Sequence, residues 1–226
     1  MNSLWFEDEL EPSQDASRNQ SGEKGPPPSR ISEAARGVVR ALEPRWESLG
    51  EAPLTSGVPA RLWRVRLWFE FEPKSESSTF AFARCEAYLI ATGTDEPQPS
   101  VYDLYPRDLY EGVPQVVSLN FGPSLKVAGA EASVGKLSTD ISIGKVAPVT
   151  VGYAGENGRF PHWELRAKKH PLEGIRNLWL IIAQPRGCNG IRLSARVEGV
   201  IQTHWGPVPV YPKKRDWDNR PSVAIR

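Results

Sequence analysis

The segment VYDLYPRDLYEG, residues 101–112, gathers side chains that could bind a ligand or carry acid–base chemistry. It repeats Asp-Leu-Tyr at 103–105 and at 108–110, with Arg107 between the repeats. Carboxylate pairs beside aromatic rings are used by glycoside hydrolases, and tyrosine-rich loops bind proteins or sugars. The ordinary alternative is a structured loop whose tyrosines pack on the body and whose acids pair with Arg107. We expect no catalysis here, and keep one binding hypothesis: a glycan-type ligand held by Tyr102, Asp103, Tyr105, Asp108 and Tyr110.

Other residue combinations that support catalysis or cofactor binding are missing from the sequence. The three histidines lack the i, i+4 spacing of a zinc-binding helix, and Cys85 and Cys188 form no CxxC pair. There is no GxSxG nucleophile motif and no phosphate-binding loop with Lys-Ser or Lys-Thr. We therefore expect no enzyme activity, no metal and no cofactor. Both cysteines are expected to be free and buried.

Charge and hydropathy limit the classes of partner. The formal net charge is +1 and the pI is near 7.8, whereas dedicated nucleic-acid-binding domains usually exceed about 9. The longest apolar run, LWLIIA at 178–183, is far shorter than the ~20 residues of a membrane helix. The start, MNSLWFEDELEP, places acids where a signal peptide needs apolar residues. The sequence predicts a soluble, cytoplasmic protein with no membrane span and no nucleic-acid partner.

The stretch LWRVRLWFEFEP, from residue 62, alternates with period two, as a half-buried strand does. Trp63, Val65, Leu67, Phe69 and Phe71 fall on one side. The other side carries Arg64, Arg66, Trp68, Glu70 and Glu72, and mixes charge with a tryptophan. Since tryptophan outside a core is often an interface anchor, we expect Trp68 to be covered by a helix, by the tail or by a partner.

The patterns of several other stretches predict strands. Residues 77–93 carry small residues at one parity and aromatic or charged ones at the other, and residues 191–204 place Ile191, Leu193, Ala195, Val197 and Ile201 on one face. The run NLWLIIAQ, residues 177–184, predicts a central strand with Trp179 in the core. Further strands are expected at 113–121, 124–129, 131–136, 145–153 and 162–168. About eight strands without intervening helices predict an all-β fold, an antiparallel β-sandwich over residues 55–212.

The two ends of the chain differ from this body in composition. Residues 7–30 are polar and end in GPPPSR, which favours a disordered linker. The stretch ISEAARGVVRAL, residues 31–42, has apolar residues at helical spacing and predicts a short amphipathic helix. We therefore predict a mostly disordered N-terminal arm, residues 1–54, and a C-terminal tail, residues 213–226.

The functional hypothesis follows from what the sequence lacks and from where its tryptophans lie. No catalytic motif is present, and aromatic side chains stand in both terminal segments. The leading hypothesis is a non-catalytic assembly protein whose body is a platform and whose arm and tail dock on a protein partner or on other copies of the chain. Its partner-binding residues would be Trp5, Phe6, Trp68 and Trp217. The glycan-type module is the alternative.

Overall fold

The computed structural model describes residues 3–13, 27–53, 59–109, 115–120, 138–143, 149–155, 158–168, 171–212 and 220–226. It contains one helix in these ranges, α2 (Pro28–Ala34), and is otherwise built of strands. The first strands are β1 (Leu4–Pro12), β2 (Gly37–Pro53), β3 (Pro59–Pro73), β4 (Thr79–Ala91), β5 (Ser100–Tyr105), β6 (Asp108–Leu109) and β7 (Gln115–Asn120). The others are β8 (Ser138–Ile143), β9 (Val149–Tyr153), β10 (His162–Arg166), β11 (Gly174–Pro185), β12 (Ile191–Thr203), β13 (Gly206–Pro212) and β14 (Ser222–Ile225).

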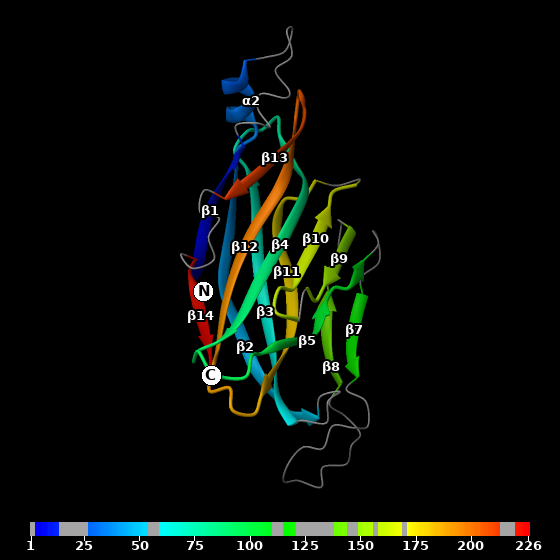
Figure 1. The fold of residues 1–226 in the computed structure, drawn as a ribbon. Coiled ribbons are helices and arrows are strands. Elements are labelled where there is room, and N and C mark those ends of the chain that lie inside the picture. Colours follow the sequence, from blue (N-terminus) through cyan, green and yellow to red (C-terminus); the bar gives the residue numbers. More distant parts are fainter. Residues whose placement is uncertain are drawn as a thin grey trace.

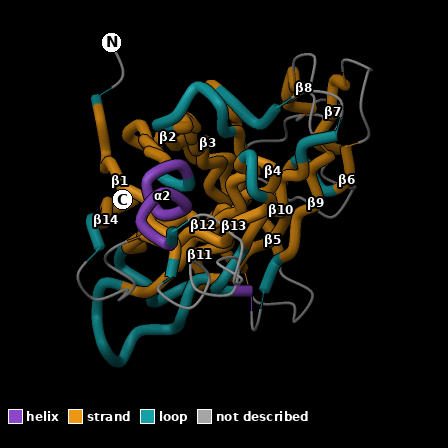
Figure 2. The backbone as a smooth tube through the Cα atoms, turned by 90° about the horizontal axis from the view of Figure 1, so that it is seen from above, coloured by secondary structure: helices purple, strands orange, loops and turns teal. Residues whose placement is uncertain are grey.

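Twelve of these strands form one antiparallel sheet, in the order β5-β11-β3-β2-β1-β13-β12-β4-β10-β9-β6, with β14 added beside β12. The long strands run along an elongated molecule, and α2 lies at one end of it (Figure 1). β7 and β8 form a separate two-stranded sheet. Both views place this pair on the side of the molecule where β9 lies (Figures 1 and 2).

The large sheet curls until its two end strands approach each other. β5 and β6 are the last strands at opposite ends of the sheet, yet only Pro106 and Arg107 separate them in the chain. The Gly152 amide of β9 donates a hydrogen bond of 2.8 Å to the Arg107 carbonyl oxygen. The chain therefore crosses from one end of the sheet to the other at this corner, and the sheet is nearly closed.

The core lies inside the curled sheet and follows the alternation of the strands. Every second residue of β3, from Trp63 to Phe71, is buried, as are the matching residues of β12 from Ile191 to Ile201. Trp163 of β10 is fully buried in the same core. Ile31 of α2 is also fully buried, so the helix closes one end of the core. Burial of large apolar side chains is the main stabilising contribution to such a fold.

The all-β prediction is confirmed, but the eight-stranded sandwich is wrong because the strands form a nearly closed sheet of more than ten. Sequence patterns showed the inward faces of β3 and β12 correctly. They could not show that β1, β2, β13 and β14 would join the same sheet, since pairing between distant strands leaves no local signal. The predicted strands at 124–129 and 131–136 lie outside the described residues.

The N-terminal region also differs from its prediction. The helix expected at 31–42 is α2, which ends at Ala34, and from Gly37 the chain is a strand. β2 pairs with β1 on one side and β3 on the other, and these hydrogen bonds outweigh the weak helical preference of GVVRAL. A Cβ on Gly37 would lie 2.5 Å from the Phe80 ring. Disorder of the arm is not confirmed, because β1 and β2 belong to the large sheet.

No helix in the described part of the chain has the length and apolar character required to cross a membrane.

The corner that closes the sheet provides a stability test. A Cβ on Gly152 would lie 2.7 Å from the Pro106 carbonyl oxygen and 2.1 Å from Leu104 Cδ1. The carbonyl belongs to the backbone of the corner and cannot rotate away. We expect Gly152→Ala to lower the free energy of unfolding by about 1–3 kcal/mol, as overpacking does, measured by urea denaturation. Ser222→Ala, at an exposed position of β14, is the control and should change it little. Equal stability of the two variants would contradict tight packing at the corner.

Candidate functional site

The outward face of β2, β3 and β11 carries a row of arginine and tryptophan side chains. The strands pair so that Arg45, Arg66 and Trp179 stand side by side across the sheet. Arg64 and Trp68 flank Arg66 two residues away on the same face of β3. We call these five residues, Arg45, Arg64, Arg66, Trp68 and Trp179, the arginine–tryptophan row.

Each guanidinium in this row lies over an indole ring. Arg66 is 4.7 Å from the ring centroid of Trp68 and 4.9 Å from that of Trp179. Arg45 lies 5.8 Å from the Trp68 ring, and Arg64 lies 5.6 Å from the Trp179 ring. Cation–π contacts of this kind contribute about 0.5–1 kcal/mol each at exposed positions. The contacts fix the guanidiniums in place on an outward-facing surface.

Arg64 and Arg66 of the row have different side-chain partners. Arg64 forms an ion pair with Glu47. Arg66 instead donates to the neutral amide oxygen of Asn177, at 2.9 Å from Nη2 and 3.3 Å from Nε. Burial lowers the pKa of Arg66, and repulsion from Arg45 lowers it further. Two like charges are thus held close together on this face.

Trp68 was expected to be covered by a helix, the tail or a partner, but arginine side chains of the same sheet lie over its ring. Trp68 is only 6% exposed, and the guanidiniums of Arg45 and Arg66 both lie over its ring. The cover therefore includes neighbouring side chains of the sheet itself. The core position expected for Trp179 is wrong, because it lies opposite Arg66 on the outward face and is partly exposed. Its neighbours Leu178 and Leu180 are the inward residues.

The structure describes only part of the tyrosine-rich segment. Asp103 is central to the described part: it accepts hydrogen bonds from the Tyr105 hydroxyl at 2.5 Å and from Arg107 Nε at 2.8 Å. Burial and this carboxylate raise the pKa of Tyr105. Tyr102 is 44% exposed and lies at the register shift between β5 and β11. Asp108 is the first residue of β6, with its side chain outside the described set, and Tyr110 lies outside the described residues.

The predicted docking residues of the termini lie in different settings. Phe6 is buried, with its ring edge-on to Phe69 at 6.5 Å, and Trp5 packs partly buried against the same core. Asp8 of β1 pairs with Arg220 at 2.5 Å, beside the C-terminal strand β14. Trp217 lies outside the described residues.

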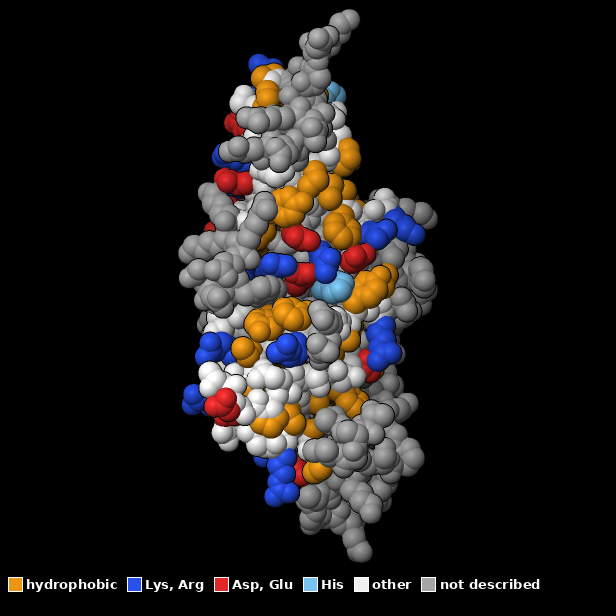
Figure 3. Space-filling model, viewed as in Figure 1, with side chains coloured by type: hydrophobic (Ala, Val, Ile, Leu, Met, Phe, Trp, Pro, Cys, Tyr) orange, Lys and Arg blue, Asp and Glu red, His pale blue; other side chains and the backbone are white. Residues whose placement is uncertain are grey.

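The outward face of β4, β10 and β12, on the other side of the curled sheet, carries a network of charged side chains. Glu86 of β4 forms an ion pair with Arg84 at 2.8 Å and accepts a hydrogen bond from Arg196 Nε at 2.5 Å. His162 stands directly opposite Glu86 and stacks on Tyr153 with ring centroids 4.8 Å apart. Figure 3 views the molecule from this side and shows acidic, basic and histidine side chains between hydrophobic patches. Since each carboxylate here has a cation beside it, the network is internally balanced.

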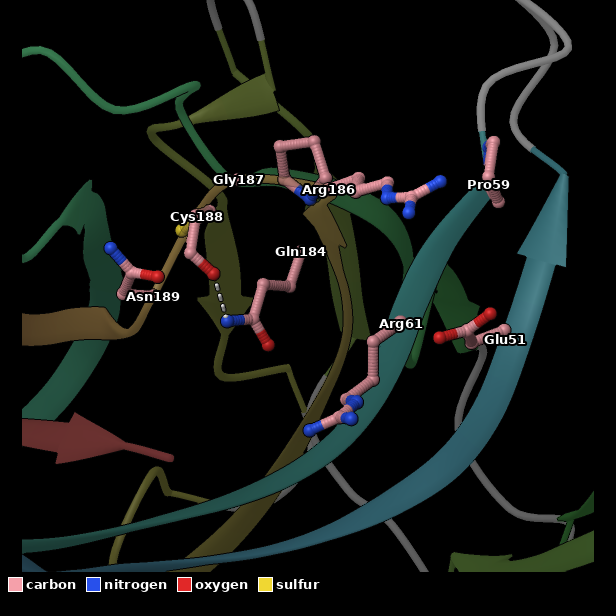
Figure 4. A pocket seen from close by; sticks show the side chains of 9 residues that line it. Glu51, Pro59, Arg61, Gln184, Arg186, Gly187, Cys188 and Asn189 are labelled. Atoms are coloured by element: carbon pink, nitrogen blue, oxygen red, sulfur yellow. Dashed lines mark hydrogen bonds between the residues drawn. The ribbon is translucent and has the colours of Figure 1, made fainter.

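A cavity of about 470 Å³ lies where β2, β3 and β11 end, and Figure 4 shows its lining. Two of its polar side chains, Gln184 and Asn189, form hydrogen bonds with neighbouring residues. Gln184 accepts from Trp63 Nε1 and donates to the Cys188 carbonyl oxygen, both at 2.6 Å, and Asn189 donates to Glu96 at 2.6 Å. Among the described residues, no three His, Cys, Asp or Glu side chains converge as metal ligands. The charged residues Glu51, Arg61 and Arg186 also line the cavity.

The β7–β8 ribbon is the remaining candidate. Its register pairs Val117 with Ile141 and Leu119 with Thr139, and at the alternate positions Ser118 with Asp140 and Asn120 with Ser138. Residues directly opposite in an antiparallel pair share a face. One face of the ribbon is therefore rich in apolar residues, and the other is rich in polar residues.

No protein-family model and no curated protein matches the chain. Solved structures do resemble it. They include delta-toxin from Clostridium perfringens, with 11% identity and a TM-score of 0.40, covering 84% of this chain and 94% of that one. A protein named "Pore forming protein" has 9% identity and a TM-score of 0.41, covering 82% and 90%. The Clostridium perfringens NetB toxin in its membrane inserted form has 8% identity and a TM-score of 0.32, covering 81% and 94%.

These comparisons overturn the functional expectations drawn from the sequence. The similar structures are named as toxins and as a pore-forming protein, and one of them is in a membrane-inserted form. The assembly platform, the glycan-binding module, the cytoplasmic location and the exclusion of membranes are therefore corrected. Those expectations rested on net charge and hydropathy, which say little about the surfaces that strands present.

His162 provides a pH test of the balanced face. Burial lowers its pKa below the ordinary 6.5, and the Arg84 charge lowers it further, outweighing the opposite effects of Glu86 and Glu164. Because the unfolded chain then binds the proton more readily, stability is fully present above about pH 6.5 and falls as pH drops toward the folded pKa. We expect His162→Asn to reduce this loss of stability between neutral and mildly acidic pH, measured by urea denaturation at several pH values. Identical pH slopes for both proteins would contradict the burial of a neutral imidazole.

Proposed function

We propose that this protein permeabilises lipid membranes by inserting the β7–β8 ribbon as a pair of membrane-spanning strands. The observation that carries the proposal is the two-faced register of the ribbon. In a bilayer, a strand must present apolar side chains to the lipid while polar side chains on the other face meet water. The pairs Val117–Ile141 and Ser118–Asp140 occupy alternate faces in this way.

The sequence around the ribbon supplies the necessary length. A membrane-crossing strand needs about 9–11 residues, and β7 and β8 are shorter, at six residues each. The sequence beyond β7 continues the alternation, with Phe121, Leu125 and Val127 at odd positions and Gly122, Ser124 and Lys126 at even positions. Residues 117–127 therefore have the length of one crossing and alternate on both sides of Pro123, which lacks a backbone N–H donor and interrupts the pattern.

The ribbon can move without dismantling the body. The hydrogen-bonded path of the large sheet runs through β10, β9 and β6, and within the described residues β7 and β8 pair only with each other. Extraction of the ribbon would leave that path intact. The apolar interior of the body would stay buried during insertion.

A single ribbon cannot be the inserted form. Its two outer edges would expose unpaired backbone N–H and C=O groups to hydrocarbon, at a cost of several kcal/mol each. Ribbons from several copies, joined edge to edge into a closed ring of strands, would satisfy these groups. The proposal therefore includes assembly of identical copies at the membrane, with the polar faces lining a water-filled pore.

Paired lysine substitutions test the ribbon. Val117→Lys places a charge on the apolar face, where lysine costs up to about 2–4 kcal/mol near the bilayer midplane. We expect this variant to lose release of a trapped dye from lipid vesicles. Ser118→Lys places the same charge one residue away on the polar face, opposite Asp140, and should retain release.

Thermal melting of both variants checks that the body is folded. Equal release by Val117→Lys and Ser118→Lys would contradict insertion of this ribbon. Absence of release by the unmodified protein, across vesicles with neutral and anionic lipids, would contradict the function itself.

A further inference from the structure

The inward face of the large sheet changes from apolar to charged where β2 and β11 end and β3 begins. Arg61 is two residues from the core residue Trp63, so both side chains leave β3 on the same face. Gln184 of β11 lies directly opposite Arg61 on one side, and Glu51 of β2 lies directly opposite it on the other. Residues paired in this way share a face. The three residues therefore form a row in the lining of the cavity of about 470 Å³.

Buried hydrogen bonds fix the wall of this cavity. Gln184 is only 8% exposed, and its amide accepts from Trp63 Nε1 and donates to the Cys188 carbonyl oxygen. The Arg61 guanidinium lies 5.8 Å from the centroid of the Trp63 ring. One indole thus positions both the amide and the guanidinium, which gives the cavity a defined polar wall before any ligand enters.

The charged residues of the lining have no ionic partners of their own. Glu51, Arg61 and Arg186 are exposed, and none of them forms an ion pair in the part of the chain that the structure describes. Figure 4 shows the three side chains spread around the opening rather than pressed together. Each can therefore bind a charged group of a ligand without first breaking an ion pair. The lining offers two positive charges and one negative charge.

We propose that this cavity binds a free dicarboxylic amino acid such as glutamate. Arg61 and Arg186 each bind one carboxylate, because the fork of a guanidinium matches two carboxylate oxygens. Glu51 binds the ammonium group. The two negative charges and one positive charge of the ligand thereby complement the lining. The inference goes beyond the proposed membrane function and does not depend on it.

The strand register sets the order of these groups. Directly opposed residues of an antiparallel pair have Cβ atoms about 4.5–5.5 Å apart, and Glu51 and Arg61 are such a pair. An amino acid carries its ammonium and one carboxylate on a single carbon, so neighbouring strands can bind both. Arg186 follows β11 directly and binds the second carboxylate. A cavity of this volume is in the usual range for small molecules.

Isothermal titration calorimetry of the full chain, without lipid, tests the inference. The ligands are L-glutamate, glutarate, which lacks the ammonium group, and L-glutamine, which lacks the second carboxylate. We expect saturable binding of glutamate and about tenfold weaker binding of each analogue, since each loses one charge-assisted hydrogen-bonded pair. Glu51→Gln should weaken glutamate binding but not glutarate binding. Arg186→Gln should weaken glutamate binding but not glutamine binding.

The control removes an arginine far from the cavity. Arg30 is exposed on α2, which precedes β2, whereas Glu51 lies near the other end of that strand. Arg30→Gln should keep the affinity for glutamate within a factor of about two, because distant charges are screened at physiological salt. Thermal melting checks the fold of every variant. If a variant melts at a lower temperature, Arg61→Lys gives a second reading, since it keeps the charge but lacks the planar fork.

Three results would overturn the site. They are absence of saturable glutamate binding at millimolar concentration, equal affinity for the three ligands, and equal losses in Arg30→Gln and Arg186→Gln. Because the titration contains no lipid, its outcome is separate from that of the dye-release assay. Glutamate binding by a protein that releases no dye would keep the site and contradict the pore. Dye release by a protein that binds no glutamate would do the reverse.

Discussion

The pairing of β3 with β11 is the constraint on which the rest of the structure depends. It runs from Phe71–Gly174 to Ala60–Pro185 without a register shift. This one alignment places Trp63 near Gln184 inside the sheet and Arg66 opposite Trp179 outside it. A slip of one residue would exchange the two faces. It would carry arginines into the core and remove the arginine–tryptophan row at once.

The structure consists of one large curled sheet, the body, and a separate two-stranded ribbon, β7–β8. The body has paired strands throughout its described length, and its corner at Pro106 and Arg107 joins the two ends of the sheet. Such closure leaves little edge for other chains to pair with. The β7–β8 ribbon stands apart from this closed network. The proposed insertion would use this combination, because the large sheet would keep its structure while the ribbon moved into the bilayer.

Local alternation made part of the fold predictable. The inward residues of β3 and β12 followed directly from period two, because side chains of a strand point to alternate faces. Strand partners were not predictable, since β3 and β11 are about a hundred residues apart in sequence. The sequence placed Trp179 wrongly in the core, because a continuous apolar run does not show which alternate residues face inward. Its pairing with Arg66 shows which face of the sheet it occupies. The two-faced ribbon was likewise hidden, because its faces emerge from the register of β7 with β8.

The connectivity of the sheet also has a consequence for how the chain reaches this state. β4 must find β12, and β3 must find β11, across about a hundred intervening residues. Loop-closure entropy opposes these pairings until several have formed together. Refolding from denaturant should accordingly be slow for a chain of this size, with alternating apolar strands exposed to one another before the sheet closes. Dilute solution would then favour recovery of the native protein, because the competing reaction between chains rises with concentration.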